Sequence, residues 1–203
     1  EWRQPLFPTG TGEFSIGAWQ WKGYVQGHTH RGSRRRVKDL KTEPITIMVR
    51  PLPNRPPEFT GAVGNFDVNA SLLQSEVVQG APTTLVVRVS GRGNPDAIAA
   101  PPLPEIAWAH VSEPSSEFKY TNEQDYGLIE KRFEYQITPL KAGNRTIPEI
   151  GFCYFEPALG SYRTEKVKPF QVHVKPSGES EELVAIGGIQ ERDKNRVEIL
   201  GTD

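Results

Sequence analysis

The sequence predicts an all-β protein: one complete immunoglobulin- or fibronectin-like sandwich, preceded by a truncated copy of the same unit. Three features favour this class, namely strict apolar–polar alternation, frequent turn residues and an internal repeat. The 203 residues include 18 prolines and 19 glycines, which indicates many turns and few long helices. One sandwich needs roughly 100 to 130 residues, so the chain has room for one unit and part of another.

Three segments alternate between apolar and polar side chains, as strands do when one face lies on a core and the other in water. They are residues 66–72, 83–91 and 131–138. Turn-forming sequences separate them, and the Gly-Arg-Gly-Asn-Pro string at residues 91–95 is predicted to be such a turn. Short strands at this spacing are typical of a sandwich.

An internal repeat connects the beginning of the chain to its later part. It opens with a proline, a glycine and an isoleucine at identical spacing: Pro8, Gly12 and Ile16, then Pro139, Gly143 and Ile147. An aromatic-rich stretch follows in each copy, and then a strand between prolines, at residues 44–51 and 169–176. The repeat distance shortens by about six residues between these two anchors. We therefore expect a longer loop in the first copy, containing residues 27–36.

These patterns divide the chain into four parts. Residues 1–51 are expected to be the C-terminal part of a first sandwich, and residues 52–58 a stiff proline-rich linker. Residues 59–175 form the expected complete sandwich. Residues 176–203 are expected to be a partly ordered tail.

Composition restricts the classes of function. Lys and Arg (24) nearly balance Asp and Glu (25), so no overall field attracts nucleic acid or an anionic membrane. A single cysteine excludes an internal disulfide, and no apolar run is long enough to span a bilayer. No catalytic motif is present, so we expect neither an enzyme nor a cofactor. The chain reads as a fragment of a longer protein.

Several ordered segments together resemble the BatD family of bacterial oxygen-tolerance (aerotolerance) proteins. They are FTGAVGNFDVNASL at residues 59–72, the segments 76–94 and 100–105, and the closing stretch 133–164. The resemblance covers nearly the whole chain.

The resemblance implies a periplasmic location, on the extracytoplasmic side of the bacterial inner membrane, with the parent protein anchored in that membrane. It implies a non-enzymatic scaffold or adaptor that contacts proteins. The expected partners are von Willebrand A-domain Bat proteins and a linked MoxR-type AAA ATPase system. Two alternatives remain open, a carbohydrate-binding or accessory β-sandwich module and a purely structural spacer.

One local cluster is the candidate interaction loop. It comprises two histidines and four arginines: His28, His30, Arg31, Arg34, Arg35 and Arg36. A metal site would need about two more ligands than the histidines supply, so we expect no metal here. The arginines could instead contact phosphate groups, anionic lipid or an acidic patch of a partner.

Three further residues carry expectations about burial. Trp19 and Trp21 share one face of their strand and are expected to be core residues of the first copy. Without a covering sheet they would form a sticky surface, and open strand edges beside them would favour dimerisation. Cys153 lies between aromatic residues in a predicted strand, so we expect a buried, unreactive thiol.

Overall fold

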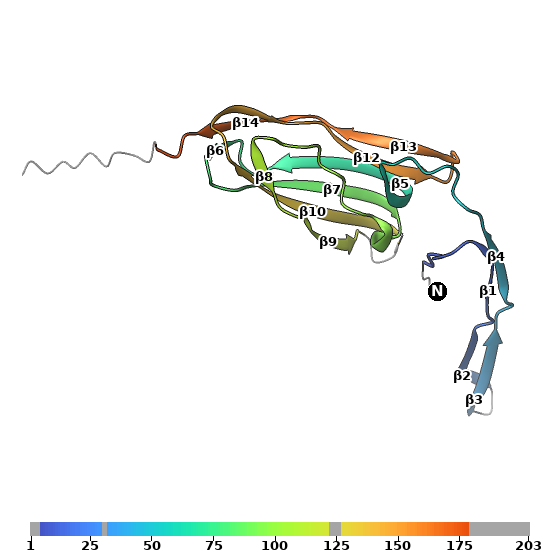
Figure 1. The fold of residues 1–203 in the computed structure, drawn as a ribbon. Coiled ribbons are helices and arrows are strands. Elements are labelled where there is room, and N and C mark those ends of the chain that lie inside the picture. The colour runs from blue at the N-terminus through green and yellow to red at the C-terminus, as the bar shows by residue number, and fades with distance from the viewer. Residues whose placement is uncertain (1–4, 30–31, 122–126, 179–203) are drawn as a thin grey trace, which may run out of the picture.

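The computed structural model describes residues 5–29, 32–121 and 127–178, and in this part the chain is all-β. The described residues contain no α-helix, only the 3₁₀ turn η1 (Pro95–Ala97). Figure 1 shows two parts, an elongated body built from β5–β14 and a thinner hairpin built from β1–β4. We call them the main β-body and the N-terminal hairpin. The predicted all-β class is confirmed, and the predicted tail beyond residue 178 lies outside the described residues.

A curled, mixed sheet of seven strands forms most of the main β-body. Its strand order is β13-β12-β5-β7-β10-β8, and β9 also pairs with β10. The strands are β5 (Phe59–Leu72), β7 (Thr83–Gly93), β8 (Ala109–Val111), β9 (Ser115–Tyr120), β10 (Leu128–Pro139), β12 (Ile150–Glu156) and β13 (Ser161–Val167).

A second sheet has three strands in the order β11-β14-β6, namely β11 (Gly143–Ile147), β14 (Phe170–Lys175) and β6 (Glu76–Val78). Two residues separate β11 from β12, and two separate β13 from β14. These four strands are thus one long antiparallel hairpin that passes from one sheet to the other at residues 148–149 and 168–169. Two pairs are parallel, β5 with β12 and β6 with β14.

The core is one cluster of buried apolar side chains with members from both sheets. The predicted alternation is confirmed here, since Leu85, Val87 and Val89 are completely buried on one face of β7. Phe66 meets Phe152 and Tyr154 edge-on, with ring centroids 6.0 and 5.5 Å away. Such aromatic pairs stabilise a core beyond the area they bury.

The turn predicted at residues 91–95 is partly wrong. The strand β7 continues to Gly93, and the chain turns only at η1. The glycines permit this because a Cβ on Gly91 or Gly93 would lie within 3 Å of Phe66 atoms. They serve close packing of β7 against the Phe66 ring rather than chain reversal.

The N-terminal hairpin consists of β1 (Gly12–Ile16), β2 (Gln20–Thr29), β3 (Gly32–Lys41) and β4 (Ile45–Val49). The strand β1 pairs with β4, and β2 pairs with β3. The pairing register repeats that of the main β-body. Gly12 faces Val49 as Gly143 faces Val174, and Trp21 faces Leu40 at the place where Phe152 faces Glu165. The sequence repeat is therefore also a repeat of strand register.

The longer loop expected at residues 27–36 is wrong. The extra residues lengthen two paired strands, since β2 and β3 have ten residues each, whereas β12 and β13 have seven. Insertion of equal numbers into both strands preserves their register.

Candidate interaction surfaces

The predicted basic cluster lies at the far end of the N-terminal hairpin. His28 pairs with Ser33 through the backbone, and Arg34, Arg35 and Arg36 continue along β3. His30 and Arg31 lie outside the described residues. The cluster is thus carried mainly by paired strands, and the hairpin holds it away from the main β-body (Figure 1). Whether it binds a partner remains a prediction.

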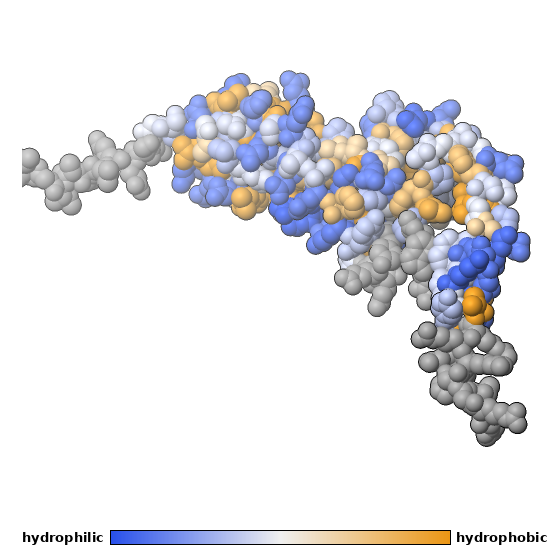
Figure 2. Space-filling view, turned by 90° about the horizontal axis from the view of Figure 1, so that it is seen from below, coloured by the Kyte–Doolittle hydropathy of each residue, from blue (hydrophilic) through white to orange (hydrophobic). Residues whose placement is uncertain are grey.

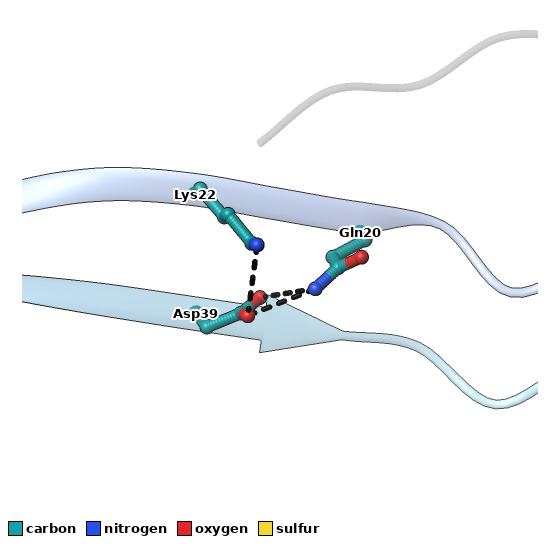
Figure 3. A network of polar contacts seen from close by, with 3 residues as sticks. All are labelled: Gln20, Lys22 and Asp39. Atoms are coloured by element: carbon teal, nitrogen blue, oxygen red, sulfur yellow. Dashed lines mark hydrogen bonds and ion pairs between the residues drawn. The ribbon is translucent and has the colours of Figure 1, made fainter.

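One face of the hairpin carries a polar network (Figure 3). The Gln20 amide nitrogen donates to both Asp39 carboxylate oxygens, at 2.9 and 2.8 Å. The Lys22 ammonium lies 3.9 Å from Asp39. All three side chains are exposed, so this network contributes little to stability. Its importance is that it identifies the solvent face of β2 and β3.

The opposite face is apolar. Trp21 and Leu40 are cross-strand neighbours there, because they alternate with Lys22 and Asp39. Trp19 is 56% exposed and Trp21 is 41% exposed. The equivalent residues of the main β-body, Ile150 and Phe152, are 1% and 0% exposed. The expected burial of the two tryptophans is therefore not seen among the described residues, because no sheet covers them.

Trp21 partly shields itself by folding over Gly23. A Cβ placed on Gly23 would lie 1.9 Å from the Trp21 ring, so the ring occupies the space above the glycine. At the matching position the main β-body has Tyr154, which stacks on Phe152 at 5.9 Å. The tryptophans therefore occupy core positions of the repeat.

A clamp of aromatic side chains holds the linker between the two parts. The Tyr162 hydroxyl donates to the Pro53 carbonyl at 3.0 Å, and the Arg55 guanidinium lies 5.2 Å above the Phe59 ring. Tyr162 also meets both Phe59 and Phe155 edge-on at 5.2 Å. We call Pro53, Arg55, Phe59, Phe155 and Tyr162 the linker clamp. It fixes the proline-rich segment on the main β-body.

A groove of about 750 Å³ opens where the two parts meet. It is lined by residues 7–11 and 49–53 on one side, and by Gly61, Val63, Asn94 and Ala97 on the other. Arg50 and Arg55 also belong to its wall. These residues form a mixed apolar and basic surface at the junction of the two parts.

The shifted titratable groups of the main β-body are explained by packing. Burial lowers the pKa of Lys131, and Asp96 partly opposes this effect. Burial raises the pKa of Tyr135, whose hydroxyl donates to the Pro101 carbonyl at 2.5 Å. Burial also raises the pKa of Tyr154, while Arg163 acts in the opposite direction. Each group is occupied by a structural contact.

Cys153 is buried, as expected, and its carbonyl accepts a hydrogen bond from Thr60 at 2.7 Å. In the described ranges, no three His, Cys, Asp or Glu side chains are grouped so that they could hold a metal ion. A helix long and apolar enough to cross a membrane is likewise not found in that part of the chain.

On the molecular surface, apolar residues (orange) are interspersed with hydrophilic ones (blue) on both parts of the molecule (Figure 2). Exposed apolar side chains on the hairpin include Trp19, Trp21, Leu40, Ile45 and Met48. Alternation in the sequence predicts which of these side chains share a face, but it does not show whether another sheet covers that face. The hairpin is therefore the candidate interaction region of the described chain.

Comparison with known proteins identifies the family. The sequence profile of the BatD DUF11-like domain matches residues 70–174, which is just over half of the chain and covers most of the main β-body. Neither the search of curated proteins nor that of solved structures returned a match. The profile match agrees with the resemblance found in the sequence. The chain belongs to the BatD family.

Proposed function

We propose that this chain is a non-enzymatic scaffold or adaptor of the bacterial Bat system, acting in the periplasm as part of a membrane-anchored protein. The observation that carries the proposal is the BatD match over residues 70–174. Family membership supports a role beside other Bat proteins. The proposed partners are von Willebrand A-domain Bat proteins and, through them, a MoxR-type AAA ATPase system.

The proposed fold of residues 59–175 is an immunoglobulin-like sandwich. Support comes from the antiparallel order β5-β7-β10 in one sheet and β11-β14 in the other, with a core between them. The short parallel strand β6 beside β14 also suits this topology. Sandwiches of this kind present loops and edges to partners and host many functions.

The hairpin end is the proposed contact point for a partner. The paired strands carry Arg34, Arg35 and Arg36 to a position far from the linker (Figure 1). Arginine suits a partner with acidic side chains because its guanidinium binds carboxylates in a bidentate manner. The cluster would mainly raise the association rate, and this effect would weaken with salt.

A structural spacer is the second candidate, and the linker clamp favours it. The Tyr162 hydrogen bond to Pro53 and its edge-on contact with Phe59 fix the connection between the hairpin and the main β-body. A pure spacer would hold its two ends at a set distance and bind no partner along its length.

Co-purification distinguishes the two candidates. The 203-residue chain is immobilised and exposed to envelope extract, beside a variant with Arg34, Arg35 and Arg36 replaced by Gln. The adaptor proposal expects von Willebrand A-domain Bat proteins in the eluate of the natural chain, and about tenfold less with the variant at low salt. Circular dichroism checks that both chains are folded. If folded natural chain retains no Bat protein, the spacer is favoured.

A further inference from the structure

One face of the N-terminal hairpin carries apolar side chains, as a protein core does, but most of these side chains are exposed. We call it the hairpin face, and its members are Phe14, Ile16, Trp19, Trp21, Leu40, Ile45, Ile47 and Val49. Five of them are at least 39% exposed, namely Phe14, Trp19, Trp21, Leu40 and Ile45. Exposed apolar side chains that share one face of paired strands indicate a face that another layer covers.

The main β-body shows what covers the same face in the other copy of the repeat. Ile147, Phe152, Val172 and Val174 stand at the positions of Ile16, Trp21, Ile47 and Val49, and all four are buried. Their cover is the layer β5-β7-β10, whose inward side chains belong to the same core cluster.

The strand edges of the two copies differ in the same way. In the main β-body, the start of β5 runs parallel to β12, with Phe59 beside Cys153 and Val63 beside Phe155. The strand β6 runs parallel to β14. Among the described strands, β2 pairs with β3 alone and β4 with β1 alone. The hairpin thus offers two edges that lack the parallel neighbours found in the second copy.

We propose that the hairpin face is covered by a β-layer of the same polypeptide that precedes β1 in the chain, with one strand parallel to β2 and a short strand parallel to β4. The order of elements supports this, since β5, β7 and β10 precede β11 in the main β-body. The inference rests on the repeated register and is independent of the proposed function.

A second copy of the hairpin would not reproduce this arrangement. Two identical β2 edges related by a twofold axis pair antiparallel, whereas the repeat specifies a parallel neighbour. The parallel geometry therefore favours cover from the same chain over self-association.

Amide hydrogen exchange tests the proposal. It is measured on the protein as the cell makes it and, for comparison, on the 203-residue chain. In the cell-made protein we expect amides of β2 and β4 to exchange about 100-fold more slowly than in the 203-residue chain. Amides of β12 and β14 serve as the internal reference and should not change. Equal exchange of β2 and β4 in both proteins overturns the proposal. Protection that grows with protein concentration, or that requires another protein, also overturns it.

Two neighbouring residues of β4 provide matched variants. Ile47 lies on the hairpin face, at the position of the buried Val172, whereas Met48 lies on the other face and is 65% exposed, like its exposed counterpart His173. In the cell-made protein, Ile47→Lys should abolish the protection of β2 and β4, and Met48→Lys should leave it unchanged. Retained protection of β12 confirms that the main β-body is folded in both variants. Equal effects of the two substitutions contradict the proposal.

Discussion

Lys131 is a charged residue at an inward position of β10, in line with the buried Ile129 and Phe133. Its ammonium donates to the carbonyls of Pro95 and Ile98, at 2.7 and 2.8 Å, and lies 5.4 Å from the centre of the Phe133 ring. The side chain thereby ties the η1 segment to the sheet. A half-buried cation is tolerated when its hydrogens are bonded in this way.

Replacing this lysine should loosen η1. Lys131→Met keeps the length of the side chain but removes the ammonium donor from both carbonyls. The Pro95 carbonyl then keeps only the long bond from the Ile98 amide, at 3.4 Å. We expect the free energy of unfolding to fall by about 1–2 kcal/mol, measured by urea denaturation. Lys119→Met, at an exposed site on β9, is the control and should change stability by less than about 0.5 kcal/mol. An unchanged midpoint for Lys131→Met would show that the two hydrogen bonds contribute nothing.

The raised pKa of Tyr135 makes the free energy of unfolding depend on pH in the alkaline range. Its pKa is raised above the ordinary value of 10.0 because burial disfavours the phenolate. The folded protein therefore keeps this proton after the unfolded chain has lost it. This contribution to stability is complete below about pH 10 and declines as the pH rises further.

Tyr135→Phe should flatten that decline. The variant loses the hydrogen bond to Pro101, at a cost of about 1 kcal/mol near neutral pH. Denaturation at a series of pH values above 10 measures the slope. The remaining slope would come from other tyrosines, including Tyr154, whose pKa is also raised by burial. The same slope in both proteins would contradict the role assigned to Tyr135.

The inward residues of β5, β7 and β10 could be predicted because the period of two places alternate side chains on one face. The partners of Lys131 and Tyr135 could not. Their carbonyl acceptors lie more than 30 residues away in sequence, in a segment with no periodic pattern. The burial of Cys153 followed from its strand, whereas alternation alone could not predict that no described sheet covers Trp21.

At the scale of elements, the repeat predicts matched glycines. Gly12 and Gly143 begin equivalent strands and both have positive φ, 117° and 106°. A side chain is strained in this conformation. Gly143→Ala should therefore lower the free energy of unfolding of the main β-body by about 1–3 kcal/mol. Gly12→Ala should leave the main β-body unchanged and increase exchange in β1 and β4 only. Destabilisation of the main β-body by Gly12→Ala would show that the two parts unfold together.

The linker clamp predicts a fixed angle between the hairpin and the main β-body. Spin labels on Lys38→Cys and Lys141→Cys, both at exposed positions, report the distance between the parts. The natural Cys153 is buried and should not react. We expect a narrow distance distribution, which should broaden when Tyr162→Ala removes the hydrogen bond to Pro53 and the ring contacts. A broad distribution before the substitution would contradict the clamp.

The long strands and the repeat could be predicted because alternation and proline spacing are local signals. The short strands β6 and β8 could not, since three residues are too few to establish a period. The error at residues 27–36 has a physical cause. An insertion shared equally by two paired strands changes the sequence distance between the repeat anchors as much as a longer loop does. Only the pairing register distinguishes the two cases.

At the scale of the molecule, the main β-body that matches the BatD family and the N-terminal hairpin have different roles in the proposed adaptor. The main β-body supplies a rigid core, the linker clamp orients the hairpin, and the hairpin carries the basic cluster away from that core (Figure 1). In the proposed adaptor, this cluster would supply the electrostatic attraction to an acidic partner.

A binding titration tests this account most directly. The purified 203-residue chain is titrated with a purified von Willebrand A-domain Bat protein of the same cell by isothermal calorimetry. The account predicts saturable binding that weakens with salt, and about tenfold weaker binding when Arg34, Arg35 and Arg36 are replaced by Gln. The absence of binding by folded natural chain at low salt would contradict the adaptor function.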